Sequence, residues 1–360
     1  MPDERPTRLA IVLFNLGAPD HPEAVRPFLR NLFRDPGILR VPSPVRAILG
    51  WWIARSRYKP AEENYARLGG RSPLLDLTRA QATALTAALP EFVVRCFIAM
   101  RYWHPLSDAT ARAVLAWRPD SVLLLPLYPQ YSSTTSGSAL MAWREAAARA
   151  GLATSVHAIC CYPAEAGFIS AVTEMAKTLY ESKRRELPQS VPLRILFSAH
   201  GLPKAIVDAG DPYEWQIRRT VAAVLSAWGD PEPDWAICYQ SRATPQEWLS
   251  PSTDAEIERA ARDRVAVLVV PVAFVSEHSE TLVELDIDYR ALAERLGVPG
   301  YFRVETPGTH PSFITGLAGM VRAELARPAG LHAMAGLQLC PPDHQLCACC
   351  SGTEVLCPTS

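Results

Sequence analysis

The stretch 272-VAFVSEHSETLVELDIDY-289 joins an apolar run directly to a block of acidic residues. Its first half ends the run 265-VAVLVVPVAFV-275, whose unbroken hydrophobicity is typical of a strand covered on both faces. Its second half carries six ionisable side chains: Glu277, His278, Glu280, Glu284, Asp286 and Asp288. Because ligands bind at the carboxyl ends of parallel strands, this stretch predicts a parallel α/β fold with a functional site at the strand end.

Other apolar runs alternate with helical segments along the rest of the chain. The runs cover residues 9–17, 92–100, 121–129, 155–162, 193–201, 235–241 and 301–306. This alternation predicts an α/β fold, and we expect two similar lobes, each a four-stranded parallel sheet flanked by helices in a Rossmann-type topology. The lobes are expected over residues 1–150 and 151–327, and a cysteine-rich extension over 328–360.

Composition narrows the class of protein. The 360 residues are 49% hydrophobic, which is enough for two packed lobes, and the formal net charge of −1 gives no support for nucleic-acid binding. The N-terminus lacks the pattern of a secretory signal, and no apolar run reaches the roughly 20 residues that span a bilayer. We therefore expect a cytoplasmic protein that at most rests on the inner membrane.

No GxGxxG or GxxxxGK[ST] motif follows a predicted strand, so neither type of nucleotide site is supported.

Residues at the other predicted strand ends suit a flat, mostly apolar ligand. The runs are followed by Asn15-Leu16, Arg101-Tyr102, Tyr131-Ser132 and the segment around His200. Aromatic rings, hydroxyls, an arginine and a histidine therefore gather at one rim. Such a rim is typical of a large apolar pocket with a polar end.

His200 and the acidic row are the candidates for chemistry. A histidine at a strand end can simply cap a carbonyl group, and an acidic row can be a solvated helix face. Glu277, Glu280, Glu284 and Asp288 are spaced by 3, 4 and 4 residues, which would place them in one stripe of a helix. Like charges at this spacing repel, so the row is easier to understand if it handles cations or protons.

Taken together, these motifs resemble the ferrochelatase family, which inserts ferrous iron into a porphyrin in the last steps of heme synthesis. The resemblance runs in order through most of residues 9–310. Its segments are LFNLGAP, RYWHP, LPLYPQYSSTTSGS, LFSAHGLP, YQSRATPQEWLSPST and PVAFVSEHSETLVELDIDY.

The resemblance implies a chelatase-like fold of two lobes with the porphyrin between them, and a lyase activity. It implies that His200 and Glu280 are catalytic and meet the Fe²⁺ substrate, with His278 as their neighbour. An imidazole suits both proton transfer near neutral pH and Fe²⁺ ligation. Glu284 and Asp288 would extend this site as a conduit for protons or iron.

The resemblance also implies a set of porphyrin-binding residues. They are Leu16, Arg101, Tyr102, Tyr131, Ser132 and Trp248. Some relatives that act on coproporphyrin have a tyrosine where Leu16 stands. A small apolar residue there favours the less charged protoporphyrin IX as the substrate.

Residues 45–60 allow two interpretations. The segment VRAILGWWIARSRYKP combines bulky apolar side chains with arginine and lysine. It could be a core helix with a basic end. It could also form a lip that rests on a membrane surface, because tryptophan and basic residues favour the headgroup region.

Five of the nine cysteines lie within the last 21 residues. The tail resembles that of bacterial ferrochelatases with a [2Fe–2S] cluster, which implies Cys340, Cys347 and Cys349 as ligands together with one distant cysteine. Cys161 is our choice for the fourth ligand, with Cys160 or Cys350 as alternatives. Zinc also suits four thiolates, and an accidental cysteine-rich tail is a further alternative.

Two other functions stay open beside iron insertion into protoporphyrin IX. A sister chelatase would insert cobalt or nickel into a tetrapyrrole, and a carrier would bind heme or porphyrin without catalysis. His200 with Glu280 favours an enzyme over a carrier, since a carrier needs no base at the macrocycle nitrogens. The sequence does not decide whether the chain forms a homodimer.

Overall fold

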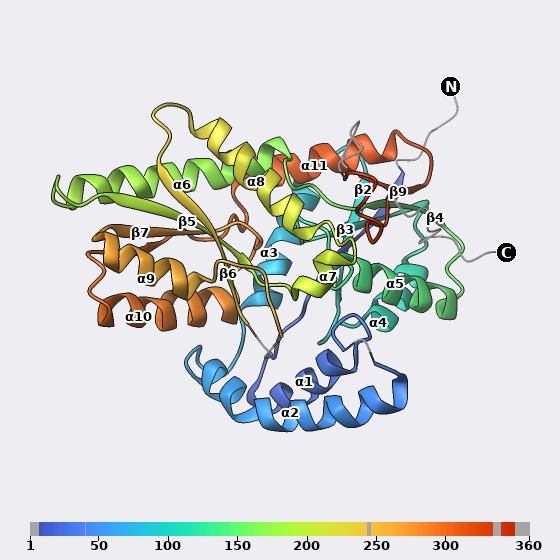
Figure 1. Ribbon diagram of the computed structural model, residues 1–360. Coiled ribbons are helices and arrows are strands. Elements are labelled where there is room, and N and C mark those ends of the chain that lie inside the picture. The colour runs from blue at the N-terminus through green and yellow to red at the C-terminus, as the bar shows by residue number, and fades with distance from the viewer. Residues whose placement is uncertain (1–6, 40, 243–245, 334–339, 350–360) are drawn as a thin grey trace. The chain divides into compact units, whose positions relative to one another are not determined.

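The structure is a computed structural model that describes residues 7–39, 41–242, 246–333 and 340–349. The chain divides into two compact units: unit 1 comprises Met1–Tyr162 and Ile314–Ser360, and unit 2 comprises Pro163–Phe313. Each unit contains one parallel sheet flanked by helices (Figure 1). The predicted α/β class with two parallel sheets is therefore confirmed, but the sheet of unit 1 has five strands instead of the expected four.

The sheet of unit 1 has five strands in the order β2-β1-β3-β4-β9. They are β1 (Arg8–Asn15), β2 (Val93–Met100), β3 (Ser121–Pro126), β4 (Ser155–Ile159) and β9 (Gly330–His332). All neighbouring pairs are parallel. Helices α4 (Ser107–Trp117) and α5 (Ser136–Ala150) cover one face, where Val12, Val114 and Trp143 share a core. Burial on both faces explains why these strands read as continuous apolar runs.

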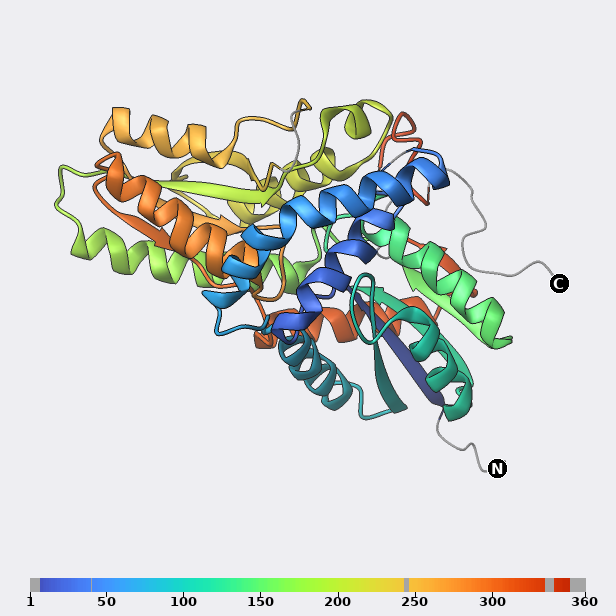
Figure 2. The ribbon, with the colours of Figure 1, turned by 90° about the horizontal axis from the view of Figure 1, so that it is seen from below.

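The remaining helical elements of unit 1 are η1 (Pro22–Ala24), α1 (Val25–Arg34), α2 (Ser43–Ala66), α3 (Leu74–Ala87) and most of α11 (Pro311–Leu325). Helices α1 and α2 lie side by side (Figure 2). Gly50 permits this close packing, because a Cβ atom there would lie 2.6 Å from the Phe33 carbonyl oxygen. The α2 face toward α1 thus consists of small residues such as Gly50 and Ala54.

The sheet of unit 2 has four parallel strands in the order β6-β5-β7-β8. They are β5 (Leu193–His200), β6 (Asp234–Gln240), β7 (Ala266–Pro271) and β8 (Tyr301–Arg303). The helical elements are α6 (Ala166–Glu186), α7 (Lys204–Asp208), α8 (Tyr213–Trp228), α9 (Thr253–Asp263), the π-helix η2 (Glu280–Asp288) and α10 (Tyr289–Arg295). One face of the sheet packs against α9, η2 and α10 through Ile257, Leu285 and Ala293.

Two boundaries differ from those expected. Strand β4 pairs with β3 in unit 1, so the division of the chain falls after Tyr162 rather than after residue 150. The extension expected only to carry cysteines also supplies β9, whose Leu331 pairs with Ala158 of β4. A strand of three residues has too little apolar pattern to be recognised from sequence.

The strand β9 is hydrogen-bonded to the sheet next to the adjacent cysteines Cys160 and Cys161. The Cys160 amide donates a hydrogen bond of 2.8 Å to the His332 carbonyl. The His332 Nδ1 atom lies 2.5 Å from Glu324 of α11, whose side chain is buried. These contacts lead the chain from α11 to the edge of β4.

Candidate active site

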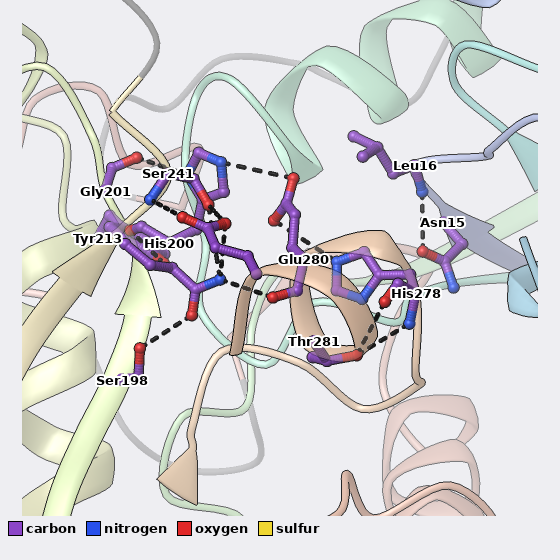
Figure 3. A network of polar contacts seen from close by, with 12 residues as sticks. Asn15, Leu16, Ser198, His200, Gly201, Tyr213, Ser241, His278, Glu280 and Thr281 are labelled. Atoms are coloured by element: carbon purple, nitrogen blue, oxygen red, sulfur yellow. Dashed lines mark hydrogen bonds and ion pairs between the residues drawn. The ribbon is translucent and has the colours of Figure 1, made fainter. Parts of the chain in front are cut away.

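A carboxylate between two imidazoles forms the centre of the candidate site in unit 2 (Figure 3). His200 Nε2 lies 3.7 Å from Glu280 Oε1, and His278 Nε2 lies 3.5 Å from Glu280 Oε2. The His278 side chain is buried, whereas those of Glu280 and His200 are 25% and 38% exposed. The site is therefore closed behind His278 and accessible at His200.

The topology of the sheet brings these residues together. His200 is the last residue of β5, and Glu280 is the first residue of η2, which follows the neighbouring strand β7. Carboxyl ends of parallel strands meet at one edge. The predicted proximity of His200, His278 and Glu280 is thus a consequence of the strand order in unit 2.

Hydrogen bonding fixes the tautomer of His200. Its Nδ1 lies 2.5 Å from the Gly201 carbonyl oxygen. A carbonyl oxygen can only accept, so Nδ1 carries the hydrogen, and in the neutral ring Nε2 is then the proton acceptor. The Tyr213 hydroxyl also donates to the His200 carbonyl at 3.1 Å. His200 therefore presents its basic nitrogen on the side of Glu280.

The environment keeps Glu280 ionised. Burial raises the pKa of Glu280, but the charge of His200 and the contact with His278 outweigh burial and lower this pKa to about 2. An ionised carboxylate 3.7 Å from Nε2 can stabilise a positive charge on the imidazole ring. The arrangement is therefore suited to accepting a proton at His200.

Glu284 lies next along the π-helix, in a different environment. It accepts hydrogen bonds from the Ser241 amide at 2.8 Å, from the Ser241 hydroxyl, and from the Tyr289 hydroxyl at 3.1 Å. Burial raises the pKa of Glu284, the Ser241 hydrogen bonds oppose this, and the negative charge of Glu280 adds to the increase. Neighbouring carboxyl groups with opposite pKa shifts are typical of acid–base sites.

Gln240 connects these groups, and the sequence analysis did not identify it. This buried residue ends β6; its Nε2 donates to the Glu280 carbonyl at 3.0 Å and to Glu284 at 3.3 Å, while its Oε1 accepts from Ser198 at 2.9 Å. The next residue, Ser241, has a φ of 67°, which few residues other than glycine adopt. The rule that applies to strand ends would have drawn attention to both residues.

The expected acidic stripe is corrected by the structure. Glu277 precedes the helix, and its carboxylate lies 2.9 Å from Arg303 rather than in line with Glu280. Asp286 bonds the same guanidinium through both of its oxygens. Arg303 is buried, so it fixes these two acids as structural partners. Glu280, Glu284 and Asp288 stay together in η2, but as a π-helix rather than an α-helix. π-Helical turns are frequent at functional sites.

Trp248 lies beside the centre of the site in unit 2. The Trp248 backbone forms an isolated antiparallel β-bridge with Pro203. A Cβ atom at Gly201 would lie 3.2 Å from the Trp248 ring. The absence of a side chain at Gly201 thus lets the indole approach the end of β5. This places the indole beside Gly201, the residue that follows His200.

The expected porphyrin-binding residues of unit 1 cluster at the ends of β1, β2 and β3. The Arg101 amide donates to the Asn15 carbonyl and the Tyr102 amide to the Leu16 carbonyl, both at 2.9 Å. Leu16 and Arg101 are partly exposed, whereas Tyr102 is completely buried with its hydroxyl 2.7 Å from Asp35. Tyr131 and Ser132 are also buried. In this structure only Leu16 and Arg101 of the set in unit 1 are accessible to a ligand.

Five cysteine side chains gather beside β4 in unit 1, namely Cys160, Cys161, Cys340, Cys347 and Cys349. The Cys347 thiol makes hydrogen bonds with Cys160, Cys340 and Cys349, which lower its pKa. The Cys160 thiol contacts Cys161, Cys347 and Cys349. Cys160 therefore contacts the tail thiols Cys347 and Cys349, whereas the sequence predicts that it faces away; Cys161 contacts Cys160 and interacts electrostatically with Cys349. Cys350, the other alternative, lies outside the described residues.

Side chains that bind one metal ion must surround it at ligand distance, which is a stricter requirement than lying near one another. Within the described ranges, no group of three or more His, Cys, Asp or Glu side chains could hold a metal ion. Both the residues around Glu280 and the described cysteines fall within these ranges. Neither place is a preformed site for a single ion in this structure.

The fold is similar to that of solved chelatases. A solved structure, SirB from Bacillus subtilis with Fe³⁺, matches 89% of this chain and 96% of its own length with a TM-score of 0.51 and 12% identity. The sirohydrochlorin chelatase SirB from Bacillus subtilis subspecies spizizenii in complex with cobalt matches with the same TM-score and 13% identity. At these identities the likeness concerns the fold alone.

Sequence comparison identifies the family. The ferrochelatase family model matches residues 8–325. The ferrochelatase of Caulobacter vibrioides (strain NA1000 / CB15N) is 50% identical over 351 residues, which cover 96% of this chain and 99% of that protein. The ferrochelatase of Hyphomonas neptunium is 46% identical over 348 residues, 94% of each chain. The chain belongs to the ferrochelatase family, as the sequence motifs predicted.

Proposed function

We propose that this protein inserts Fe²⁺ into protoporphyrin IX to form protoheme, the terminal step of heme synthesis, and that His200 and Glu280 carry the reaction. Family membership supports the reaction. The observation that supports the residues is the ionised Glu280 beside the basic Nε2 of His200. Fe²⁺ is a substrate here, and insertion replaces two pyrrole N–H protons by the metal.

Proton removal is the step that this geometry serves. His200 Nε2 accepts a proton from a pyrrole nitrogen, because its Nδ1 hydrogen is already donated to Gly201. The negative charge of Glu280 then stabilises the imidazolium. An incoming Fe²⁺ is also stabilised by this carboxylate and, while Nε2 is unprotonated, by that nitrogen of His200, which are ligands that iron accepts. His278, buried behind Glu280, holds the carboxylate in place.

Glu284 and Asp288 extend the path from the centre of the site. Glu284 binds a proton more readily than an ordinary carboxylate because burial and Glu280 raise its pKa. It can therefore take the proton that leaves His200 and pass it along η2 towards Asp288. The residues of unit 1 that are accessible to a ligand, Leu16 and Arg101, are proposed to contact the porphyrin, with Trp248 as an aromatic contact in unit 2.

A [2Fe–2S] cluster is proposed at the gathered cysteines. Thiolates are the usual ligands of such clusters, and the thiol contacts join Cys160, Cys340, Cys347 and Cys349. These four cysteines would hold the cluster as its thiolate ligands. Cys160 replaces Cys161 as the proposed fourth ligand because it contacts the tail thiols. When bound, the cluster would cross-link the tail to β4 and stabilise it.

Helix α2 is proposed to rest on a membrane surface. It exposes Val45, Ile48, Leu49, Trp51 and Trp52, of which Ile48 and Trp52 are 65% and 60% exposed. A core helix would bury these side chains. Among the residues that the structure describes, no helix is both long and apolar enough to cross a bilayer. Contact at the interface fits a helix that exposes apolar side chains and tryptophan beside arginine.

The first prediction concerns the base. His200→Ala should fold and bind porphyrin but lose kcat for iron insertion by about 100-fold or more, since a positioned base contributes about that factor. The matched control is His310→Ala, because His310 also lies near a glutamate, 3.6 Å from Glu174. Activity of the folded His200→Ala protein near that of the control would contradict the assignment.

The second prediction concerns the fourth thiolate. Cys160→Ser should lose visible absorbance, bound iron and acid-labile sulfide, whereas Cys161→Ser should retain all three. Cys96→Ser, in strand β2 of the same unit, controls for the loss of a thiol. The reverse pattern, with Cys161→Ser colourless and Cys160→Ser coloured, would refute the revised assignment.

The third prediction concerns the exposed helix face. Replacement of Trp51 and Trp52 by serine should weaken binding to anionic phospholipid vesicles by about tenfold or more, because two interfacial rings are lost. Activity on detergent-solubilised porphyrin should be retained. Trp235→Ser removes an exposed tryptophan of unit 2 and serves as the control. Vesicle binding that survives the double replacement would argue against a membrane role for α2.

A further inference from the structure

A buried carboxylate in unit 1 organises the arginine at the end of β2. Asp35 follows α1 directly, and its side chain is 1% exposed. Its Oδ2 lies 2.8 Å from the Arg101 Nη2 and accepts hydrogen bonds from the Tyr102 hydroxyl at 2.7 Å and the Ser138 hydroxyl at 2.6 Å. Its Oδ1 accepts from the Gly37 amide at 2.7 Å. Four donors thus converge on one carboxylate.

The direction of these hydrogen bonds is determined by chemistry. The Ser138 hydroxyl donates its single hydrogen to Asp35, so it accepts from the Arg101 Nε at 2.7 Å. Arg101 is thereby held at two of its three nitrogens, with its guanidinium carbon 5.1 Å from the centre of the Tyr102 ring. Together these contacts fix the orientation of the Arg101 guanidinium group.

Arg101 still faces outward at its third nitrogen. Its side chain is 23% exposed, and Nη1 has no hydrogen bond or ion pair with a described residue. A ligand at this place would meet an N–H donor. It would not meet an uncompensated positive charge, because Asp35 balances the guanidinium at direct contact distance.

We propose that Asp35 is a specificity-determining residue, which cancels the charge of Arg101 so that the site prefers a porphyrin with few carboxylates. Protoporphyrin carries two carboxylates, and coproporphyrin carries four. A free arginine would favour the more acidic macrocycle, whereas a neutral donor pair does not. This inference rests on the proposed function, since it requires Arg101 to contact the porphyrin. Asp35 itself is a positioning residue that acts through Arg101.

The test compares iron insertion into the two porphyrins. The readout is the ratio of kcat/KM for coproporphyrin III to kcat/KM for protoporphyrin IX, each in the same detergent. Asp35→Asn keeps the size of the side chain and leaves Arg101 unbalanced, so the ratio should rise by about threefold or more. The double variant Asp35→Asn with Arg101→Gln removes both charges, and its ratio should return towards that of the unaltered protein.

Two variants separate charge from damage to the network. Ser138→Ala removes hydrogen bonds but no charge, and Asp76→Asn removes a carboxylate from an exposed pair with Arg79 at 2.9 Å. Both should leave the ratio unchanged, even where the overall rate falls. If Asp35→Asn does not fold, Arg101→Gln alone leaves the Asp35 charge unbalanced, and the ratio should then fall.

The outcomes also distinguish this inference from the proposed function. Unaltered protein that inserts iron into neither porphyrin would refute the function, and the inference with it. An active protein whose ratio is unchanged in the folded Asp35 and Arg101 variants would refute the inference alone. A shift of equal size in Ser138→Ala would show that geometry rather than charge sets the preference, and would also overturn it.

Discussion

The ion pair geometry around Glu280 is the constraint on which the site depends. A carboxylate that is three-quarters buried, at 25% exposure, stays ionised only if charge or hydrogen bonds compensate it. His200 and His278 supply this compensation from its two sides, at 3.7 Å and 3.5 Å. The same ion pair favours removal of a proton from a porphyrin nitrogen, because the Glu280 carboxylate attracts His200 more strongly once His200 has gained that proton.

The rest of unit 2 holds this arrangement in place. Strand β5 ends at His200, and Gln240 at the end of β6 binds the first carbonyl of η2 and the Glu284 carboxylate. Arg303 of β8 binds both Glu277 and Asp286, so its positive charge is shared by two acids of this stretch other than Glu280 and Glu284. Of the acids in this stretch, Glu277 and Asp286 thus form structural ion pairs, while Glu284 and Asp288 are left for the proposed proton path.

Much of this could be predicted from the sequence, and the exceptions have physical causes. Apolar runs gave the parallel sheets, and the motif around Glu280 gave the family. Residue spacing alone could not show that Glu277 would bind Arg303, because that partner lies on a later strand. Strand alternation suggested that Cys161 faces the tail, but Cys160 lies just after β4, where alternation no longer applies. Asp35 had no sequence signal at all.

The most direct test of the account is turnover by Glu280→Gln, measured together with porphyrin binding. The variant keeps the size of the side chain and removes the charge that stabilises protonated His200. The account predicts that porphyrin binding stays within about twofold of the unaltered protein while kcat falls by about 100-fold or more. Normal turnover by Glu280→Gln, with a loss of turnover in Glu284→Gln instead, would contradict it and move the catalytic carboxylate along η2.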